Sequence, residues 1–263
     1  MDLGIKGNVA IITASSSGLG KASAIAMVKE GVNVLINGRD KDKLDKAVKE
    51  LNALNGGEVI GFAGDLTNKD DIKNMVDKTY KVFGRIDHLI TSAGGPPSKT
   101  FKETNDNDWY FSYDLLVMSV VWLVRESLEY LEENDGGTIV NITSRSVKEA
   151  IDGLLLSNSV RMSVIGLMKT LSKELGPNIR VNAVLSGPHE TDRLKNIIKG
   201  QVDSGKFDSY QDALKARSAN IPLGRIGKPS ELGEVVTFLS SNRSSYLNGL
   251  AIPVDGGSGA SNL

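Results

Sequence analysis

Short runs of β-branched and other apolar residues alternate with longer helical stretches along most of this chain, and this alternation strongly limits its possible folds. Strands that alternate with helices form βαβ units, in which parallel strands make one sheet covered by helices on both faces. The pattern therefore predicts an α/β protein with a parallel sheet. The expected strands are residues 8–13, 32–37, 58–64, 86–93, 137–143, 179–185 and 250–257.

The length of 263 residues fits one large α/β domain, and no repeat, low-complexity tract or linker indicates a second one. We therefore expect a single doubly wound domain over residues 1–263. One segment departs from the alternation, because a long polar excursion at about residues 186–228 follows the sixth strand. Ligands of open α/β sheets bind beyond the carboxyl ends of strands, so the excursion is either a substrate lid or a surface helical insertion.

The composition excludes several classes of protein. Zero cysteines exclude disulfides, thiolate zinc sites and cysteine nucleophiles, and two histidines argue against a metal cluster, so no metal is expected. A net charge of −1 with interspersed acids and bases argues against nucleic-acid binding. No apolar run approaches the roughly 18 residues of a membrane helix, and no signal peptide is recognisable, so we expect a cytoplasmic protein without a membrane partner.

A small-residue turn follows the first expected strand, at residues 13–24 with the sequence TASSSGLGKASA. Small residues let a backbone approach a pyrophosphate, and Gly18 and Gly20 open a helix whose N-terminal amides and dipole attract negative charge. Glycine pairs also close ordinary turns. The order of strand, turn and helix within one βαβ unit nevertheless favours dinucleotide binding.

The same segment resembles the Thr-Gly-x-x-x-Gly-x-Gly loop of short-chain dehydrogenases/reductases, with Ala14 in place of the first glycine. Further matches in the family's order are GDLTN, TSAGG, GGTIVNITS, NIRVNAVLSGPHET, IPLGRIGKPSEL and the terminal VDGG, so the resemblance covers essentially the whole chain. It implies a Rossmann-type domain with a seven-stranded sheet, most similar to 3-oxoacyl-carrier-protein-reductase-like members. The cofactor-binding positions that it implies are Thr13, Ser15, Ser16, Ser17, Gly18, Leu19, Gly20, Asp65, Leu66, Ser92, Ala93, Gly94, Gly187, His189 and Thr191.

The end of the second strand bears on the choice of cofactor. Gly38 stands where NAD-preferring relatives carry an acid, and Arg39 follows it. An acid there would bind the ribose 2′-hydroxyl and repel a 2′-phosphate, whereas an arginine can hold that phosphate with two hydrogen bonds. We therefore expect NADP(H) to be preferred over NAD(H). The alternative is that Arg39 is only a solvated residue at a strand end.

The catalytic positions depart from the family's Asn, Ser, Tyr and Lys set. Ser144 matches the serine, but counting onward by the family's spacing places Ser157 at the tyrosine, Arg161 at the lysine and Leu116 at the asparagine. Arg161 can still donate to the nicotinamide ribose hydroxyls, although it cannot be deprotonated. Ser157 is a poor acid, and we expect it to be a small polar residue bonded to its own helix or to a water.

Arg161 and Ser157 lie four residues apart in an apolar stretch, so in a helix they would share one otherwise buried face. A buried charge needs a partner. By the resemblance, His189 follows the sixth strand beside the nicotinamide, and its unperturbed pKa suits acid–base catalysis near neutrality. Relatives use backbone atoms there, so His189 is a candidate acid, as are Lys148, Glu149 and Asp192, while His88 is expected to be structural.

Two functions fit these residues. The first is hydride transfer between NADP(H) and a small-molecule carbonyl or alcohol, and the second is a nucleotide-binding protein of the same fold without redox turnover that acts as a sensor or assembly partner. Relatives of this type are commonly tetramers that pair the helices after the fourth and fifth strands. The apolar runs at 115–124 and 164–168 belong to those helices, and a monomer would expose too much of that surface, so we expect a homotetramer.

Overall fold

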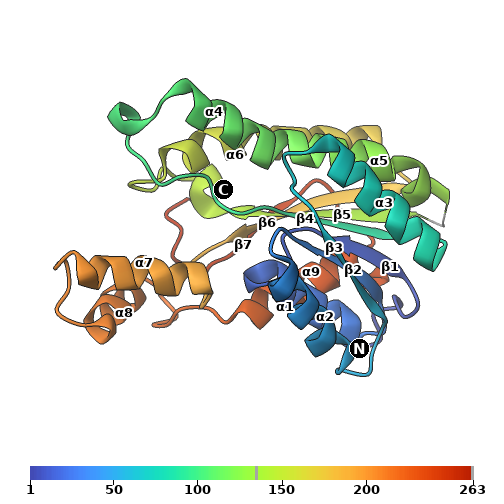
Figure 1. The fold of residues 1–263 in the computed structure, drawn as a ribbon, viewed down its shortest axis with the longest axis horizontal. Coiled ribbons are helices and arrows are strands. Elements are labelled where there is room, and N and C mark those ends of the chain that lie inside the picture. The colour runs from blue at the N-terminus through green and yellow to red at the C-terminus, as the bar shows by residue number, and fades with distance from the viewer. Residues whose placement is uncertain (134–135, 262–263) are drawn as a thin grey trace.

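Seven parallel strands form one sheet in the order β3-β2-β1-β4-β5-β6-β7, as the sequence predicts (Figure 1). The computed structural model describes residues 1–133 and 136–261, so the last two residues of the expected domain lie outside the described part. The strand order reverses beside β1, which is the switch point of a doubly wound fold. The strands are β1 (Val9–Ile12), β2 (Asn33–Gly38), β3 (Val59–Ala63), β4 (His88–Ser92), β5 (Gly137–Ser144), β6 (Ile179–Ser186) and β7 (Ala251–Val254).

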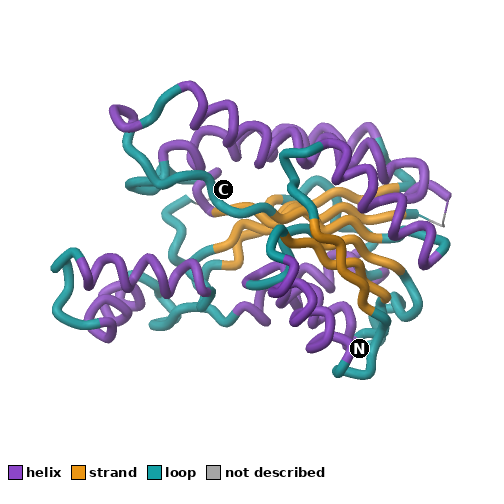
Figure 2. The backbone as a smooth tube through the Cα atoms, viewed as in Figure 1, coloured by secondary structure: helices purple, strands orange, loops and turns teal. Residues whose placement is uncertain are grey.

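Helices cover both faces of the sheet, as Figures 1 and 2 show. One face packs against α1 (Gly18–Lys29), α2 (Lys41–Asn52) and α9 (Pro229–Ser240). The other packs against α3 (Lys69–Phe83), α5 (Ser119–Glu133) and α6 (Leu155–Glu174). A shorter helix, α4 (Asp106–Tyr113), precedes α5 and contacts α6.

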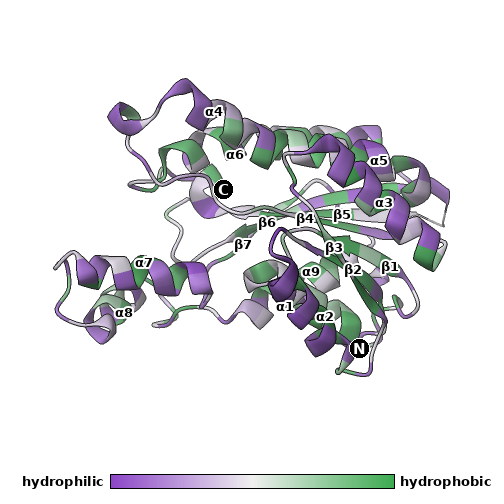
Figure 3. Ribbon diagram, in the orientation of Figure 1, coloured by the Kyte–Doolittle hydropathy of each residue, from purple (hydrophilic) through white to green (hydrophobic). Residues whose placement is uncertain are grey.

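The two layers between helices and sheet are apolar, and the strands are mostly hydrophobic in Figure 3. Val34 and Ile36 of β2 face the layer that includes Met27, while Leu35 between them faces the opposite layer. This alternation follows the two-residue period of a strand. A strand buried on both faces is mostly apolar on both, which explains the nearly continuous hydrophobic runs in the sequence.

The buried imidazole of His88 is structural, as expected. Its Nε2 lies 3.0 Å from Nδ2 of Asn8, and its Nδ1 lies 2.8 Å from Oγ1 of Thr138. Because the Asn8 amide nitrogen can only donate, Nε2 accepts and Nδ1–H donates to Thr138. Burial lowers the pKa of His88 to about 4, which keeps the ring neutral at physiological pH.

The excursion after β6 folds into two helices, α7 (Asp192–Asp203) and α8 (Tyr210–Ala219). They pack against each other and project beyond the sheet in Figures 1 and 2. The buried side chains of Ile198 and Ala213 contribute one residue from each helix to their small core. The segment has a polar sequence because only a few residues of this helical pair are buried.

The expectation that a monomer exposes the apolar runs 115–124 and 164–168 is wrong. Most of their apolar residues pack against the sheet inside the monomer. The helical face that was expected to contact a partner subunit is the face turned toward the strands. The buried members are Leu116, Val117, Val120, Leu123, Val124, Val164 and Met168.

Different residues are exposed on these helices. Tyr110 (69% exposed), Phe111 (42%) and Tyr113 lie on α4, and Met162 (51%) lies on α6. Within the described residues, no helix is both long and apolar enough to cross a membrane.

Candidate cofactor cleft and active site

Hydrogen bonds connect the carboxyl ends of the central strands, where the expected site residues gather. Thr13 Oγ1, just after β1, donates to the carbonyl of Ser92 on β4 (2.7 Å) and accepts from the Ser92 amide (2.8 Å). Ser186 Oγ on β6 donates to the carbonyl of Thr143 on β5 (2.8 Å). The residues after β1, β4, β5 and β6 are thus held in one continuous edge.

The turn after β1 has the close backbone approach expected of a pyrophosphate loop. A Cβ added at Gly20 would lie 2.7 Å from the carbonyl oxygen of Ala14, so α1 can approach the turn only because residue 20 is glycine. Ala14 itself has φ of 46°, a left-handed conformation that costs an alanine about 1 kcal/mol or more. Hydrogen bonds between the Ser15 and Asn37 backbones (2.7 Å) and from Ala14 N to Asn37 Oδ1 (3.2 Å) hold this conformation.

The N-terminus of α1 has the properties of an anion site. Its N-cap residue, Ser17, makes no side-chain capping bond, and its first turn contains no acidic residue, so the free amides and the helix dipole face outward. Thr191, after β6, lies across from this point, because a Cβ added at Gly18 would be 3.7 Å from Thr191 Cγ2. Leu19 packs into the core beneath. These residues fit the pyrophosphate and nicotinamide half of a dinucleotide.

The adenosine end of the cleft is formed after β2 and β3. Arg39 is exposed, and its Nη1 lies 3.9 Å from a carboxylate oxygen of Asp65. Asp65 also accepts from the Thr67 amide and hydroxyl, while the Leu66 side chain is buried in the core. A Cβ at Gly38 would lie 2.7 Å from Ser16 Oγ, so an acid at position 38 is sterically excluded unless Ser16 moves.

Ser144, Ser157 and Arg161 form one connected cluster. Ser144 Oγ accepts from the Ser146 amide (3.1 Å), and Ser146 Oγ lies 3.1 Å from Oγ of Ser157. Arg161 Nε then donates to Ser157 Oγ (3.2 Å). The structure confirms that Ser157 and Arg161 share a helix face, and it shows that Ser157 joins Ser146 to Arg161.

The charge of Arg161 has no acidic partner near it. Its Nη1 is 3.4 Å from Oγ1 of Thr143, and no carboxylate oxygen of a described residue lies within 4.0 Å of its guanidinium. Burial, together with the nearby positive charge of Arg193, lowers the pKa of Arg161 to about 10. Arg161 therefore remains charged at neutral pH and retains unused donors for a ligand.

A cavity of about 10 Å³ lies beside Arg161, and its lining includes Ser92, Ala93, Leu116 and Asn141. Leu116 belongs to a π-helical turn (Asp114–Met118) between α4 and α5. Asn141 Nδ2 donates to Thr91 Oγ1 (2.7 Å), but its buried Oδ1 has no hydrogen-bond partner among the described residues. The cavity has room for about one water molecule, and Asn141 Oδ1 could accept a hydrogen bond from it.

His189 is not brought to the serine cluster. Its Nδ1–H donates to the carbonyl of Gly187 (3.0 Å), and a Cβ at Gly227 would lie 2.9 Å from its ring. Burial lowers the pKa of His189, which favours the neutral ring over the protonated one. Its backbone carbonyl accepts from the Thr191 amide (2.7 Å) and so shapes the loop that faces Gly18.

The remaining acid–base candidates make no hydrogen bond to Ser144, Ser157 or Arg161. Glu149 is 2.9 Å from the guanidinium of Arg145 and accepts from the Ala260 amide (3.0 Å). Asp192 is an exposed residue that pairs with Lys195 on α7. Lys148 lines a cavity at the carboxyl ends of β6 and β7 together with Glu149. Among described residues, no group of three or more histidines, cysteines or carboxylates could hold a metal.

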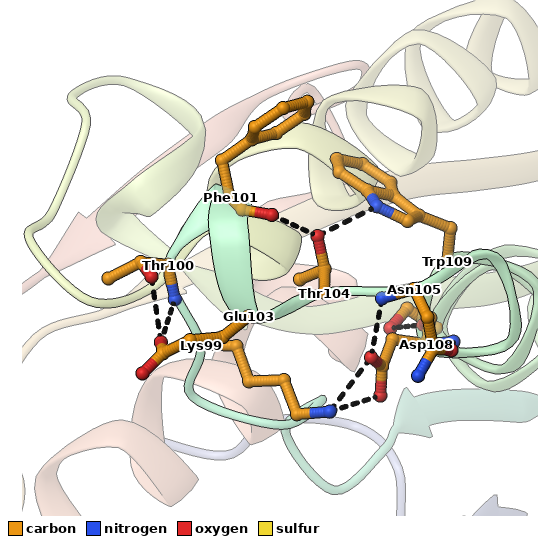
Figure 4. Close-up of polar contacts among 9 residues, drawn as sticks. Lys99, Thr100, Phe101, Glu103, Thr104, Asn105, Asp108 and Trp109 are labelled. Carbon is orange, nitrogen blue, oxygen red and sulfur yellow. Dashed lines mark hydrogen bonds and ion pairs between the residues drawn. The ribbon is translucent and has the colours of Figure 1, made fainter.

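A polar network stabilises the rim of the cleft between β4 and α4 (Figure 4). Lys99 Nζ contacts both carboxylate oxygens of Asp108 (2.9 and 2.8 Å), and Asp108 reciprocally caps α4 with Asn105. Trp109 Nε1 donates to Thr104 Oγ1 (3.3 Å). The loop that carries Gly94 into the cleft is therefore anchored immediately downstream.

Sequence reasoning missed four polar residues of this edge: Thr143, Ser146, Asn141 and Arg193. The first three have no sequence signal, since short polar residues occur at many strand ends. Arg193 lies only two residues after Thr191, yet its relevance depends on a contact with the loop after β4, which the sequence separates by almost one hundred residues.

Comparisons with known proteins agree with this arrangement. A family model described as enoyl-(acyl carrier protein) reductase matches residues 13–259. The chain is 34% identical over 254 residues to the 3-oxoacyl-(acyl-carrier-protein) reductase FabG of Thermotoga maritima, which covers 96% of this chain and 98% of that protein.

Solved structures show the same similarity. The L-sorbose reductase of Gluconobacter frateurii, complexed with NADPH and L-sorbose, has a TM-score of 0.94 and 31% identity, covering 99% of this chain and 100% of that one. A 7α-hydroxysteroid dehydrogenase complexed with NADH has a TM-score of 0.87 and 28% identity, covering 97% and 96%. The chain therefore belongs to the short-chain dehydrogenase/reductase family, a family of NAD(P)-dependent oxidoreductases.

Proposed function

We propose that this protein transfers hydride between NADP(H) and the carbonyl or alcohol group of a small molecule. The observation that carries the proposal is that a candidate dinucleotide site and a candidate catalytic cluster lie at the same edge of the sheet. The uncapped N-terminus of α1 faces Thr191, and the Ser144–Ser157–Arg161 cluster lies along the same edge. The first fits a dinucleotide and the second a polarised carbonyl oxygen.

The bound cofactor would supply or accept the hydride, and the protein's residues would do the rest. The turn at 15–20 and Thr191 would hold the phosphates and the nicotinamide side, and Arg161 would donate to the ribose hydroxyls. Ser144 Oγ accepts from Ser146 N and so keeps its own proton available for donation to the substrate oxygen. The proton would come from water, for which Arg161 and the free Oδ1 of Asn141 provide a binding place.

The second candidate is a nucleotide-binding protein without redox turnover. It is favoured by the replacement of the expected tyrosine by Ser157, whose hydroxyl is a far weaker acid than a phenol. Binding should be measured first, by fluorescence titration with NADPH, and a broad panel of carbonyl compounds should then be tested for NADPH oxidation. Oxidation of any member supports the oxidoreductase, whereas tight binding without oxidation across the panel favours the sensor.

NADPH should bind more tightly than NADH, and Arg39→Ala should narrow the difference. Arg39 is exposed and only loosely paired with Asp65, so it is free to bind a 2′-phosphate. We expect the variant to weaken NADPH binding by about 10- to 100-fold, the value of one charge-assisted contact, with little change for NADH. Lys41→Ala is the matched control, because Lys41 pairs with Asp45 on α2. Equal affinities of the unmutated protein for both cofactors would remove the argument for NADP(H).

We further propose a homotetramer whose subunits contact each other through the exposed residues of α4 and α6 and not through the buried runs. Tyr110, Phe111 and Met162 are large apolar residues that an isolated chain would leave in water. Sedimentation velocity at micromolar concentration should give four times the 28.1 kDa of one chain, and Phe111→Glu should shift the distribution to smaller species. A monomer in the unmutated protein would contradict the proposal.

A further inference from the structure

Two arginines at the active-site edge lack any acidic neighbour. Arg161 uses Nε and one Nη1 contact, which leaves most of its five N–H donors unused. Arg193, in the first turn of α7, makes no side-chain hydrogen bond to a described residue, and no described carboxylate oxygen lies within 4.0 Å of it. Burial and, after it, the positive charge of Arg193 lower the pKa of Arg161.

Arg193 is an exposed residue, and its guanidinium lies against the loop after β4. A Cβ added at Gly95 would be 1.5 Å from its Nη1 and 2.2 Å from its Cζ. Gly95 directly follows Gly94, which the sequence assigns to the cofactor cleft. Arg193 therefore reaches from α7 to the loop after β4, and Ser92 at the end of β4 and Ala93 of that same loop line a cavity with Arg161.

Three other basic side chains around this edge are paired. Lys99 contacts Asp108 (2.8 Å), Arg145 contacts Glu149 (2.9 Å) and Arg225 contacts Glu231 (2.5 Å). The whole chain has a net charge of −1, so the positive excess at the cleft is local and is not a consequence of a basic composition. Two neighbouring cations without a carboxylate nearby attract an anion and can donate hydrogen bonds to it.

We propose that Arg193 and Arg161 form a subsite for an anionic group, a carboxylate or phosphate, on the carbonyl substrate. The inference rests on the proposed oxidoreductase function and narrows its substrates to oxo acids or phosphorylated carbonyl compounds. Arg193 would hold the anionic oxygens with its planar fork. The same chemistry is present in the pyrophosphate of the cofactor, so the test must separate these two sources.

Four proteins suffice for this test: the unmutated chain, Arg193→Gln, Gly95→Ala and Lys195→Ala. Gly95→Ala keeps the charge but displaces the guanidinium, and its backbone lies outside the left-handed region, so alanine is tolerated there. Lys195→Ala is the control, because it removes a paired charge from the same turn of α7. Each protein is titrated by calorimetry with NADPH alone, and with malonate before and after NADPH loading.

In a second arm, the NADPH-loaded proteins receive 2-, 3- and 4-oxo acids, each compared with its methyl ester. We expect malonate to bind the unmutated protein and to bind Arg193→Gln and Gly95→Ala about 10- to 100-fold more weakly, with Lys195→Ala unchanged. At least one oxo acid should have a lower KM than its ester, and Arg193→Gln should remove this preference by raising the KM of the acid.

Equal malonate binding by the unmutated protein and Arg193→Gln would overturn the proposal. So would a variant that weakens NADPH binding but leaves malonate binding intact, because the arginine would then hold the cofactor's phosphates. Malonate binding that depends on Arg193 upholds the subsite even if NADPH is never oxidised. Failure of NADPH to bind would instead count against the proposed function.

Discussion

Ser144→Ala should lower kcat for NADPH oxidation by about 100- to 1,000-fold, the cost of removing one donor to a developing oxyanion, and should leave the Kd of NADPH unchanged. Ser157→Ala should lower kcat by much less than the roughly 100- to 10,000-fold expected for loss of a general acid. The physical reason is the difference in their contacts. Ser144 Oγ accepts a backbone amide and keeps its own proton for a ligand, whereas Ser157 Oγ lies between Ser146 and Arg161.

The comparison requires stopped-flow or steady-state rates with a substrate identified from the carbonyl panel, and cofactor titration for each variant. Ser146→Ala is a useful companion, because it removes the contact to Ser157 while keeping the backbone amide that holds Ser144. If Ser157→Ala abolishes turnover while NADPH affinity is intact, Ser157 is the acid or an essential link to it, and the expectation that it is only a small bonded polar residue is wrong.

The free energy of unfolding should decrease by about 2 kcal/mol between pH 8 and pH 5 through His88 alone. Burial lowers the pKa of His88 to about 4 in the folded chain, against an ordinary value of 6.5. The unfolded chain therefore binds the proton more tightly, and stability is lost as the pH falls from about 6.5 toward about 4. Protonation of Nε2 would also place an N–H against the amide of Asn8.

Urea unfolding of the unmutated protein and of His88→Gln at both pH values measures this contribution. A glutamine amide has both a donor and an acceptor and does not titrate, so the variant should lack about 2 kcal/mol of the pH dependence whatever its absolute stability. Other titrating groups, including His189, contribute to both proteins and cancel in the difference. Identical pH dependence in the two proteins would show that His88 titrates normally in the folded chain.

The parallel sheet was predictable from the sequence because strands buried on both faces are mostly apolar, as Val34, Leu35 and Ile36 of β2 show by facing the two layers in turn. The position of the phosphate turn was predictable for a similar reason. Gly18 and Gly20 follow a strand and open a helix, and the close contact of Gly20 with Ala14 is local in the chain. The helix spacing likewise determined that Ser157 and Arg161 would meet.

Contacts between distant segments were decided only by the tertiary structure. The expectation that a monomer exposes the apolar run at 115–124 was wrong, because periodicity identifies an apolar face but not the surface that covers it. The alignment placed His189 beside the nicotinamide, and only the tertiary structure shows that its ring packs against Gly227 and that its Nδ1 bonds the Gly187 carbonyl. Arg193 reaches Gly95 only because parallel strands place the loops after β4 and β6 at the same edge, so no local pattern records that contact.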